Sequence, residues 1–291
     1  MKVLVVFDNG IGNFILMTPA VQALKKFWKY GSFVMTISQK WSAFKRDAIL
    51  FQARHLMDDF VTLENVNASE YDEVFGTVWS APRSFLSMYT VPFIGYSPMG
   101  KCMHERDFYM SVVHKIGYDG PVPPMEAFAL MQCLPPSKHF RIVVCNDSYP
   151  DMRRAKIYGK MDMVINKLRK CGNFEFIGLG QPDGRDCNFD YDLRGKLRFE
   201  EMISVIAQSD MLLCNDTGLM HAASALGKPI VAVFGPTNEW KNGPLSGTVI
   251  SRDVDCRPCF HTSAFTRCGK RVCMNVEPDA VVDGVLEGVA R

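Results

Sequence analysis

Residues 211–238 read MLLCNDTGLMHAASALGKPIVAVFGPTN, and this stretch decides the fold. Two short apolar runs, residues 211–215 and 229–234, have the length of buried β-strands. The segment 217–226 that separates them is expected to form a helix. A strand, a helix and a second strand in this order predict neighbouring parallel strands in a sheet that helices cover on both faces.

The same alternation extends upstream as far as Pro135-Pro136-Ser137. Apolar runs of strand length again alternate with stretches of helical pattern: strand 141–146, helix 158–170, strand 174–179 and helix 199–208. The double proline is the natural linker. We therefore expect two α/β domains, residues 1–136 and residues 137–291.

The first domain opens with the same pattern. The apolar run Val3–Phe7 is followed by a polar turn at residues 8–13, a helix to about residue 29 and a strand at residues 33–38. This order is typical of the start of a parallel α/β sheet. Residues 65–132 are less regular, and their elements cannot be assigned from the sequence.

Composition excludes several classes of protein. The net charge is +2 and 22% of the residues are charged, whereas a nucleic-acid-binding domain usually carries a basic stripe. The apolar runs are far shorter than the roughly 20 residues of a membrane-spanning helix. Asp8-Asn9-Gly10 interrupts the first apolar run too early for a signal peptide, so a cytoplasmic location is expected.

Three polar loops follow predicted strands, and in open parallel sheets ligands bind beyond the carboxyl ends of the strands. The first, residues 8–13, contains two glycines that allow close backbone approach before a helix. In the second, residues 214–221, Asp216 or Thr217 is expected to cap the following helix, whose start favours a diphosphate. The third is residues 234–238. The alternative is that these are ordinary turns and His221 is an interior residue.

Together the three loops resemble those of glycosyltransferase family 9, the bacterial lipopolysaccharide heptosyltransferases and their relatives. The segments that carry the resemblance are Gly10–Ala20, Asp192–Lys196, Asn215–Val231, Phe234–Thr237 and Cys256–Phe260. The resemblance implies the GT-B architecture, in which two Rossmann-like domains with parallel sheets face each other across a cleft. It also implies inverting transfer of heptose from ADP-heptose, with no catalytic metal or other catalytic cofactor.

The resemblance assigns the donor to the second domain and the acceptor to the first. By position, Thr217, Gly218 and His221 contact the donor phosphates and Asp216 orders their loop. Lys156, which precedes Tyr158 at the start of the first helix of this domain, matches a lysine of the family. The donor site is completed by Gly12 and Met220. The acceptor, a glycan, a lipid-linked sugar or a protein hydroxyl, is left open, as is a peripheral contact with the inner face of the membrane through residues such as Trp28 and Lys29.

One position departs from the family pattern. The family usually has aspartate, its proposed base, where this chain has Asn13, and an amide cannot accept a proton at neutral pH. Our hypothesis is that Asp8, five residues upstream, is the base and that Asn13 orients the acceptor. The alternative is a catalytically weakened protein that binds a nucleotide-sugar without efficient turnover.

Four clustered cysteines near the C-terminus have the spacing C-x2-C-x8-C-x4-C, at Cys256, Cys259, Cys268 and Cys273. A C-x2-C pair places two thiolates on one tight turn, which suits tetrahedral zinc or iron. Four protein ligands would close such a site, so the metal would be structural. Free cysteines are the alternative, because a reducing cytoplasm disfavours disulfides. His261 is a substitute for one thiolate.

Overall fold

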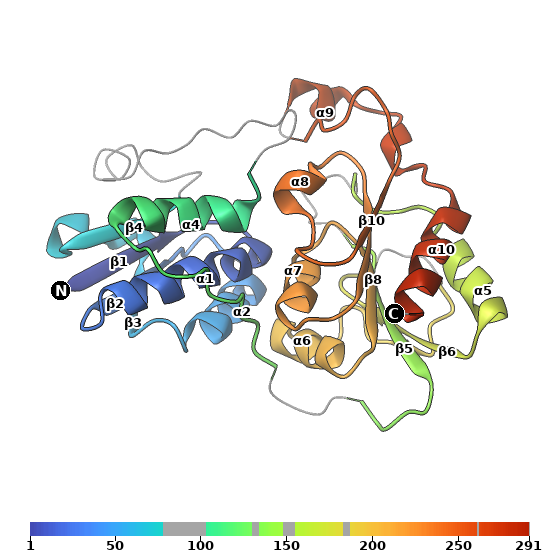
Figure 1. The fold of residues 1–291 in the computed structure, drawn as a ribbon, viewed down its shortest axis with the longest axis horizontal. Coiled ribbons are helices and arrows are strands. Elements are labelled where there is room, and N and C mark those ends of the chain that lie inside the picture. Colours follow the sequence, from blue (N-terminus) through green and yellow to red (C-terminus); the bar gives the residue numbers. More distant parts are fainter. Residues whose placement is uncertain (78–102, 130–133, 148–154, 183–186, 261, 291) are drawn as a thin grey trace. The chain divides into compact units, whose positions relative to one another are not determined.

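The structure is a computed structural model in which residues 1–77, 103–129, 134–147, 155–182, 187–260 and 262–290 are described (Figure 1). The chain forms two compact units. One comprises Met1–Tyr96 and Glu105–Glu126, and the other comprises Ser97–His104 and Ala127–Arg291. Residues 127–136 thus group with the second unit, whereas the sequence assigned them to the first domain. The boundary at residue 136 stays a prediction.

The first unit is built on a four-stranded parallel sheet with the strand order β3-β2-β1-β4. Strand β1 pairs with a strand on each side, and five of its six residues are buried, which explains its unbroken apolar run. Its carboxyl end delivers Asp8 to the edge of the sheet. The elements of this unit are β1 (Lys2–Phe7), α1 (Ile11–Phe27), β2 (Ser32–Ile37), α2 (Ala43–Ala53), β3 (Asp59–Thr62), η1 (Leu63–Asn65), η2 (Ala68–Glu70), β4 (Glu73–Thr77) and α4 (Glu105–Ile116).

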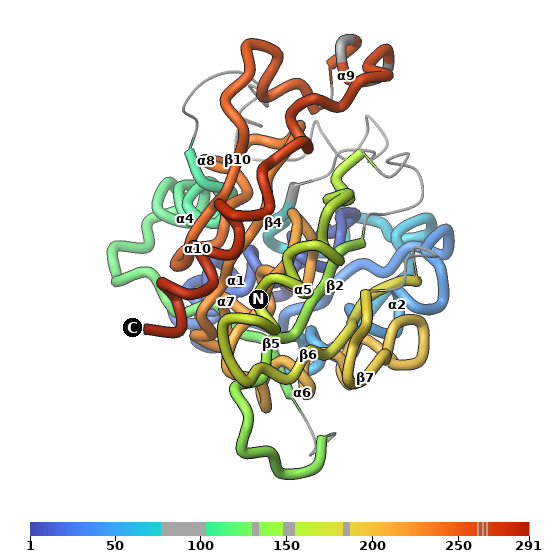
Figure 2. Tube along the Cα trace, turned by 90° about the vertical axis from the view of Figure 1, so that its right-hand side faces the viewer, coloured from blue at the N-terminus to red at the C-terminus, as the bar shows by residue number. Residues whose placement is uncertain are grey.

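The second unit contains a six-stranded parallel sheet with the strand order β10-β9-β8-β5-β6-β7. The elements are β5 (Phe140–Cys145), α5 (Met161–Cys171), β6 (Phe174–Leu179), β7 (Tyr191–Asp192), α6 (Phe199–Ala207), β8 (Met211–Asn215), α7 (Gly218–Ala225), β9 (Ile230–Phe234), α8 (Glu239–Asn242), β10 (Thr248–Ser251), α9 (Ser263–Arg267), η4 (Val272–Met274) and α10 (Pro278–Val289). Every residue of β8 and β9 is buried. The pairing of β5 with β6 can be followed in Figure 2.

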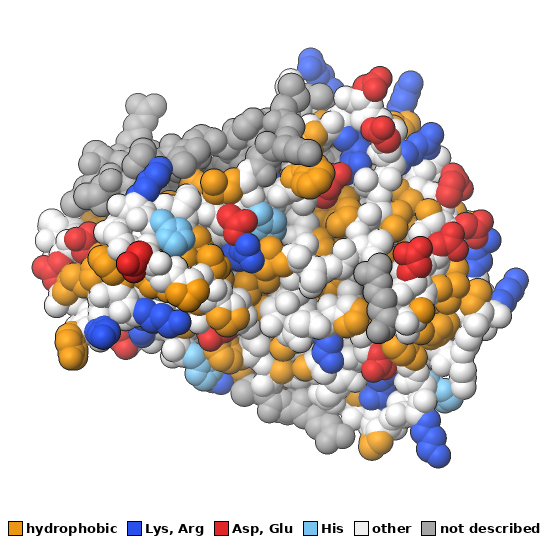
Figure 3. Space-filling view, viewed as in Figure 1, with side chains coloured by type: hydrophobic (Ala, Val, Ile, Leu, Met, Phe, Trp, Pro, Cys, Tyr) orange, Lys and Arg blue, Asp and Glu red, His pale blue; other side chains and the backbone are white. Residues whose placement is uncertain are grey.

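Helices cover both faces of the second sheet, as the sequence predicted. Figure 1 shows α5 and α10 on one face and α6 and α7 on the other, and α10 contacts α5, β9 and β10. The buried side of α10 includes Val281 and Val285. Its opposite side is acidic, and Figure 3 shows a row of acidic side chains there, with Asp279, Asp283 and Glu287 exposed. This polar and apolar division explains why α10 packs on the sheet.

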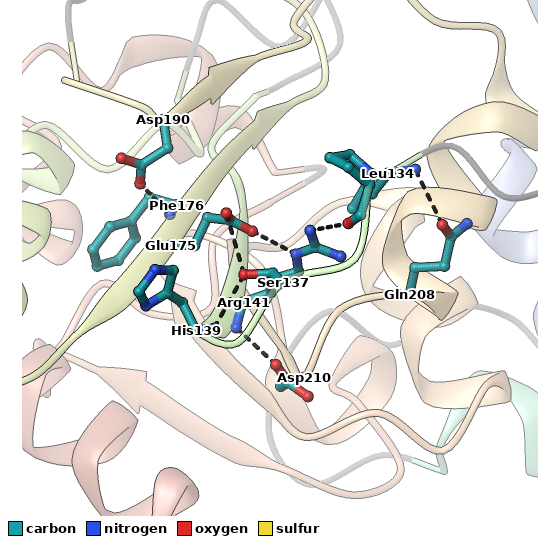
Figure 4. Close-up of polar contacts among 10 residues, drawn as sticks. Leu134, Ser137, His139, Arg141, Glu175, Phe176, Asp190, Gln208 and Asp210 are labelled. Atoms are coloured by element: carbon teal, nitrogen blue, oxygen red, sulfur yellow. Dashed lines mark hydrogen bonds and ion pairs between the residues drawn. The ribbon is translucent and has the colours of Figure 1, made fainter.

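Hydrogen bonds and one ion pair hold residues 134–137, which precede β5, against the rest of the second unit (Figure 4). The Arg141 guanidinium contacts a carboxylate oxygen of Glu175 at 2.5 Å and donates to the carbonyl oxygen of Pro135. The backbone N–H of Arg141 donates to Asp210 at 2.7 Å, and that of Leu134 donates to Gln208 at 3.1 Å. This network lies at the amino ends of the strands.

Among the helices of the described residues, none combines the length and the apolar character that crossing a membrane requires.

Candidate active site

Strands β9, β8 and β5 are neighbours in the second sheet, and their carboxyl ends lie at one edge of it. The second polar loop follows β8 and the third follows β9, so the two loops meet at this edge. Asn215, the last residue of β8, is fully buried. Its amide nitrogen donates to the carbonyl oxygens of Asp147 at 2.6 Å and of Lys156 at 2.9 Å. Asn215 therefore holds the segments on either side of residues 148–154 against the end of β8.

A buried ion pair lies directly beyond Asn215. The Lys156 ammonium is 2.7 Å from an Asp216 carboxylate oxygen, and the two side chains are only 16% and 7% exposed. Burial raises the pKa of Asp216, but the positive charge of Lys156, its hydrogen bond and His221 outweigh that effect and hold the pKa below its ordinary value. The site therefore holds an ionised carboxylate beside a lysine. That lysine also lies 4.6 Å from the centre of the Phe260 ring.

Asp147 links three strand ends at the same edge. One carboxylate oxygen accepts a hydrogen bond from the Thr217 hydroxyl at 3.0 Å, and the other accepts one from the backbone N–H of Gln181 at 3.1 Å. Gly180 has φ +93°, and a Cβ there would lie 2.5 Å from this second oxygen, so glycine is required. Asp147 was not among the residues predicted from the sequence. The sequence feature that could have indicated it is a carboxylate two residues after the end of β5, at the edge of the sheet where ligands were expected.

The expectation that Asp216 or Thr217 caps α7 is wrong. Thr217 occupies the N-cap position but makes no side-chain hydrogen bond to the helix. The reason is that both side chains bond to residues outside the helix. The Thr217 hydroxyl donates to Asp147, and the Asp216 carboxylate accepts from Lys156. The first backbone N–H groups of α7 therefore donate no hydrogen bond to these two side chains.

The remaining residues expected at the donor differ in exposure. Gly218 opens α7 and is partly exposed, whereas His221 is 7% exposed and Met220 is fully buried. His221 lies close enough to Asp216 to lower its pKa. The donor contacts of these residues stay predictions.

The cysteine segment packs against the third loop. The backbone N–H groups of Cys259 and Phe260 both donate to the carbonyl oxygen of Pro236 at 3.0 Å. The Arg257 side chain donates to the carbonyl oxygen of Gly235 at 2.6 Å and to Glu239 at 2.8 Å. These bonds fix the segment that places Phe260 beside Lys156.

The four cysteines of the cluster lie in one neighbourhood. Burial, followed by the charges of Cys259, Cys256 and Cys268, raises the pKa of Cys273 to about 11, and burial also raises the pKa of Cys259. All four are free thiols. Within the described part of the chain, which leaves out His261, no three histidine, cysteine or acidic side chains are placed to hold a metal ion.

The first polar loop lies beyond β1 in the other unit. The Asp8 carboxylate accepts a hydrogen bond from the Trp41 indole N–H at 2.7 Å. The Lys45 ammonium lies 4.1 Å from the centre of the Trp41 ring. Burial lowers the pKa of Lys45, and the charge of Asp8 acts in the opposite direction. Asp8 therefore lies in a partly buried, charged environment.

Asn13, in the first turn of α1, contacts a buried carboxylate that was not predicted from the sequence. Its amide nitrogen donates to Glu105 at 2.5 Å, and the Tyr109 hydroxyl donates to the same oxygen at 3.0 Å. Glu105 is 5% exposed. It belongs to the stretch 65–132, where the sequence offered no pattern to use. Gly12 is buried next to Asn13 within α1.

Residues 184–268 match the family model of glycosyltransferase family 9 (heptosyltransferase), the range that contains the second and third polar loops. The resemblance to glycosyltransferase family 9 is confirmed. The lipopolysaccharide heptosyltransferase 2 of Salmonella typhimurium is 40% identical over 80 residues, which are 28% of this chain and 22% of that protein. The chain thus matches about a fifth of the length of this family 9 relative.

Two solved structures extend the likeness to the whole chain. The Escherichia coli ADP-heptose lipopolysaccharide heptosyltransferase II has a TM-score of 0.72 at 15% identity, covering 100% of this chain and 99% of that one. The iron-containing dodecameric glycosyltransferase TibC from enterotoxigenic E. coli has a TM-score of 0.66 at 15% identity, covering 100% and 76%. At 15% identity, these likenesses show a shared fold only. The predicted fold class, GT-B with two parallel α/β domains, is therefore confirmed.

Proposed function

We propose that this protein is an inverting glycosyltransferase that moves heptose from ADP-heptose to a hydroxyl group of a glycan. The observation that carries the proposal is the Lys156–Asp216 pair beside the start of α7, because Asp216 and α7 lie within the stretch that matches family 9. A departing nucleoside diphosphate needs positive charge and N–H donors, and a lysine and a helix start supply both. The E. coli protein of similar fold is named for ADP-heptose.

In this proposal Thr217, Gly218 and His221 contact the diphosphate, and Asp216 holds Lys156 in place to meet it. Gly12 and Met220 complete the surroundings of the donor. Asp8 removes the proton of the acceptor hydroxyl, and Asn13 orients that acceptor. No catalytic cofactor takes part, and transfer is independent of metal.

ADP is expected to stabilise the protein selectively in a thermal-shift panel of ADP, GDP, UDP and CMP. A nucleotide at about 100-fold over its Kd contributes about 2.7 kcal/mol, a shift of a few degrees. Transfer is then measured with ADP-heptose and a heptose-terminated lipopolysaccharide core oligosaccharide. ADP binding without transfer points to the weakened binding protein instead. A panel in which no nucleotide shifts the melting temperature refutes the donor assignment.

Replacing Lys156 by methionine is expected to weaken ADP binding by roughly 10- to 100-fold, because a charge-assisted hydrogen bond contributes about 1.5–3 kcal/mol. The single change also leaves Asp216 buried without its lysine. The double variant Lys156→Met/Asp216→Asn removes both charges and tests binding apart from folding. Lys160→Met, which removes a lysine four residues away, serves as the control and keeps full affinity. Wild-type affinity in the double variant argues against phosphate binding by Lys156.

The four clustered cysteines are proposed to hold one structural zinc or iron ion. Their neighbourhood and the iron-containing TibC structure support this, although the thiols are not arranged for a metal here. Metal analysis of the purified protein is expected to give about one ion per chain, lost in Cys256→Ser/Cys259→Ser. Cys171→Ser, an exposed cysteine outside the cluster, is the control. Metal-free protein with full stability identifies the cysteines as free thiols.

The proposed location is the cytoplasm, at the inner face of the membrane. The end of α1 and the turn after it offer Phe27, which is 42% exposed, Lys29, and Tyr30, which is 96% exposed. Aromatic and basic side chains of this kind suit an anionic lipid surface. Sedimentation with vesicles that contain anionic lipid tests the contact.

A further inference from the structure

The carboxylate of Glu105 has no role in the function proposed above, yet it touches a residue of the acceptor-side loop. Glu105 opens α4, and α4 packs against α1, which carries Asn13. Its Oε1 accepts hydrogen bonds from Asn13 at 2.5 Å and from the Tyr109 hydroxyl at 3.0 Å. The contact lies wholly within the first unit.

The contact with Glu105 goes with one orientation of the Asn13 amide. The NH₂ group of Asn13 donates to Oε1 of Glu105, and an amide oxygen could not donate there. The amide oxygen then points away from Glu105. It lies toward the first loop, because a Cβ added to Gly10 would be 3.1 Å from this oxygen.

Packing alone does not call for a glutamate at this position. A carboxylate that is 5% exposed has lost most of its contact with water, and such burial is costly unless hydrogen bonds offset it. An apolar side chain would fill the contact between α1 and α4 without that cost. A glutamate can instead orient the side-chain amide of Asn13, which is only partly buried.

We propose that Glu105 is a positioning residue that fixes Asn13 as a hydrogen-bond acceptor for a hydroxyl of the sugar acceptor. This inference rests on the proposed transfer reaction, since it gives a task to Asn13 within it. With its oxygen turned to the loop, Asn13 offers the acceptor the same kind of oxygen that an aspartate would. It does not take up the proton. The site therefore selects an acceptor that donates a hydroxyl hydrogen at this point and disfavours one that presents a carbonyl or phosphate oxygen.

Glu105→Ala is expected to raise the KM for the core oligosaccharide roughly 10-fold, with the KM for ADP-heptose and the increase in Tm caused by ADP unchanged. This is the loss of one oriented hydrogen bond of about 1.4 kcal/mol. Glu105→Gln keeps an oxygen that can accept from Asn13, but its NH₂ group can also donate to the Asn13 oxygen, so it should recover only part of the affinity. Tyr109→Phe removes the other donor and leaves the Asn13 bond, so its effect is expected to be smaller.

A reciprocal exchange tests whether Asn13 and Glu105 act as a pair. Asn13→Asp alone places two carboxylates in contact, which repel each other and disturb acceptor binding. In Asn13→Asp/Glu105→Gln the new amide can donate to the new carboxylate, so one charge and one hydrogen bond are restored. We expect the double variant to bind the oligosaccharide more tightly than Asn13→Asp. A merely structural role for Glu105 predicts no such rescue.

Binding of the oligosaccharide, measured by calorimetric titration, separates this inference from the proposed function. If the wild type binds it without transfer, the proposed reaction fails, while weaker binding by Glu105→Ala still supports the inference. If Glu105→Ala binds and transfers as the wild type does, the inference is overturned and the reaction stands. If the wild type does not bind the oligosaccharide, the inference is overturned as well.

Discussion

Replacing Asp8 by asparagine is expected to lower kcat by roughly 10²- to 10⁴-fold, the usual contribution of a general base. The new amide cannot accept a proton from the acceptor hydroxyl. Its oxygen can still accept the hydrogen bond from Trp41, so the local structure should be kept. The affinity for ADP, which we assign to the other unit, should not change. Initial rates of ADP release from ADP-heptose with the core oligosaccharide measure the effect.

Asp47→Asn is the matched control for this experiment. Asp47 belongs to the same unit, its side chain is 71% exposed, and its ion pair is with the adjacent Arg46. Removing its charge should leave kcat unchanged. A full transfer rate in Asp8→Asn would show that Asp8 is not the base, and Glu105 would then be the next carboxylate to examine. Loss of ADP binding in Asp8→Asn would instead indicate damage to the fold.

Much of the fold could be predicted because its strands are buried on both faces. Strands β8 and β9 are completely buried, so their sequences are nearly continuous apolar runs with polar loops directly after them. Strand β6 was predicted with its observed bounds. Strand β3 and the short helices η1 and η2 were not predicted. The four residues of β3 are partly or fully exposed at the sheet edge, so they leave no comparable pattern.

The polar loops of the second unit were predicted in position and only in part in their contacts. The loop of Asp216 and Thr217 follows the carboxyl end of a parallel strand, as the apolar run before it predicted. That it binds a ligand stays a prediction. The sequence pattern could not show that Lys156 and Asp147 engage these side chains, because those partners are about 60 and 70 residues away in the chain. A capping preference is local, and a buried charge pair at that distance overrides it.

In the first unit the sequence pointed to Asp8 and Asn13 but not to their partners. Trp41 lies between a strand and a helix, and Glu105 lies within the stretch 65–132, where the sequence shows no readable pattern. Both reach the loop through tertiary packing, which periodicity along the chain does not encode. The departure at position 13 was visible in the sequence. The proposed reason that an asparagine suits this position, a buried carboxylate 92 residues away, was not.

Replacing Arg141 by alanine is expected to lower the free energy of unfolding by about 3–5 kcal/mol, the usual effect of breaking a buried ion pair. The side chains of Arg141 and Glu175 are 8% and 12% exposed, so the change leaves Glu175 with a buried, uncompensated charge (Figure 4). In a unit of this size the melting temperature should fall by roughly 10 °C. Differential scanning calorimetry measures the change. Because the pair lies at the amino ends of the strands, ADP affinity below the transition should be retained.

Two further variants separate the charge from the contact. Lys167→Ala breaks an exposed ion pair with Asp279 and should leave the melting temperature unchanged. Arg141→Met/Glu175→Leu removes both buried charges and should recover most of the stability, because apolar side chains of similar volume replace such pairs well. The double variant still lacks the bond to the Pro135 carbonyl, so proteolysis at residues 135–137 should be faster than in the wild type. Equal stability of Arg141→Ala and wild type would mean that Glu175 is not held by Arg141. Restored stability with faster cleavage would assign to Arg141 the task of fixing the linker to the second unit.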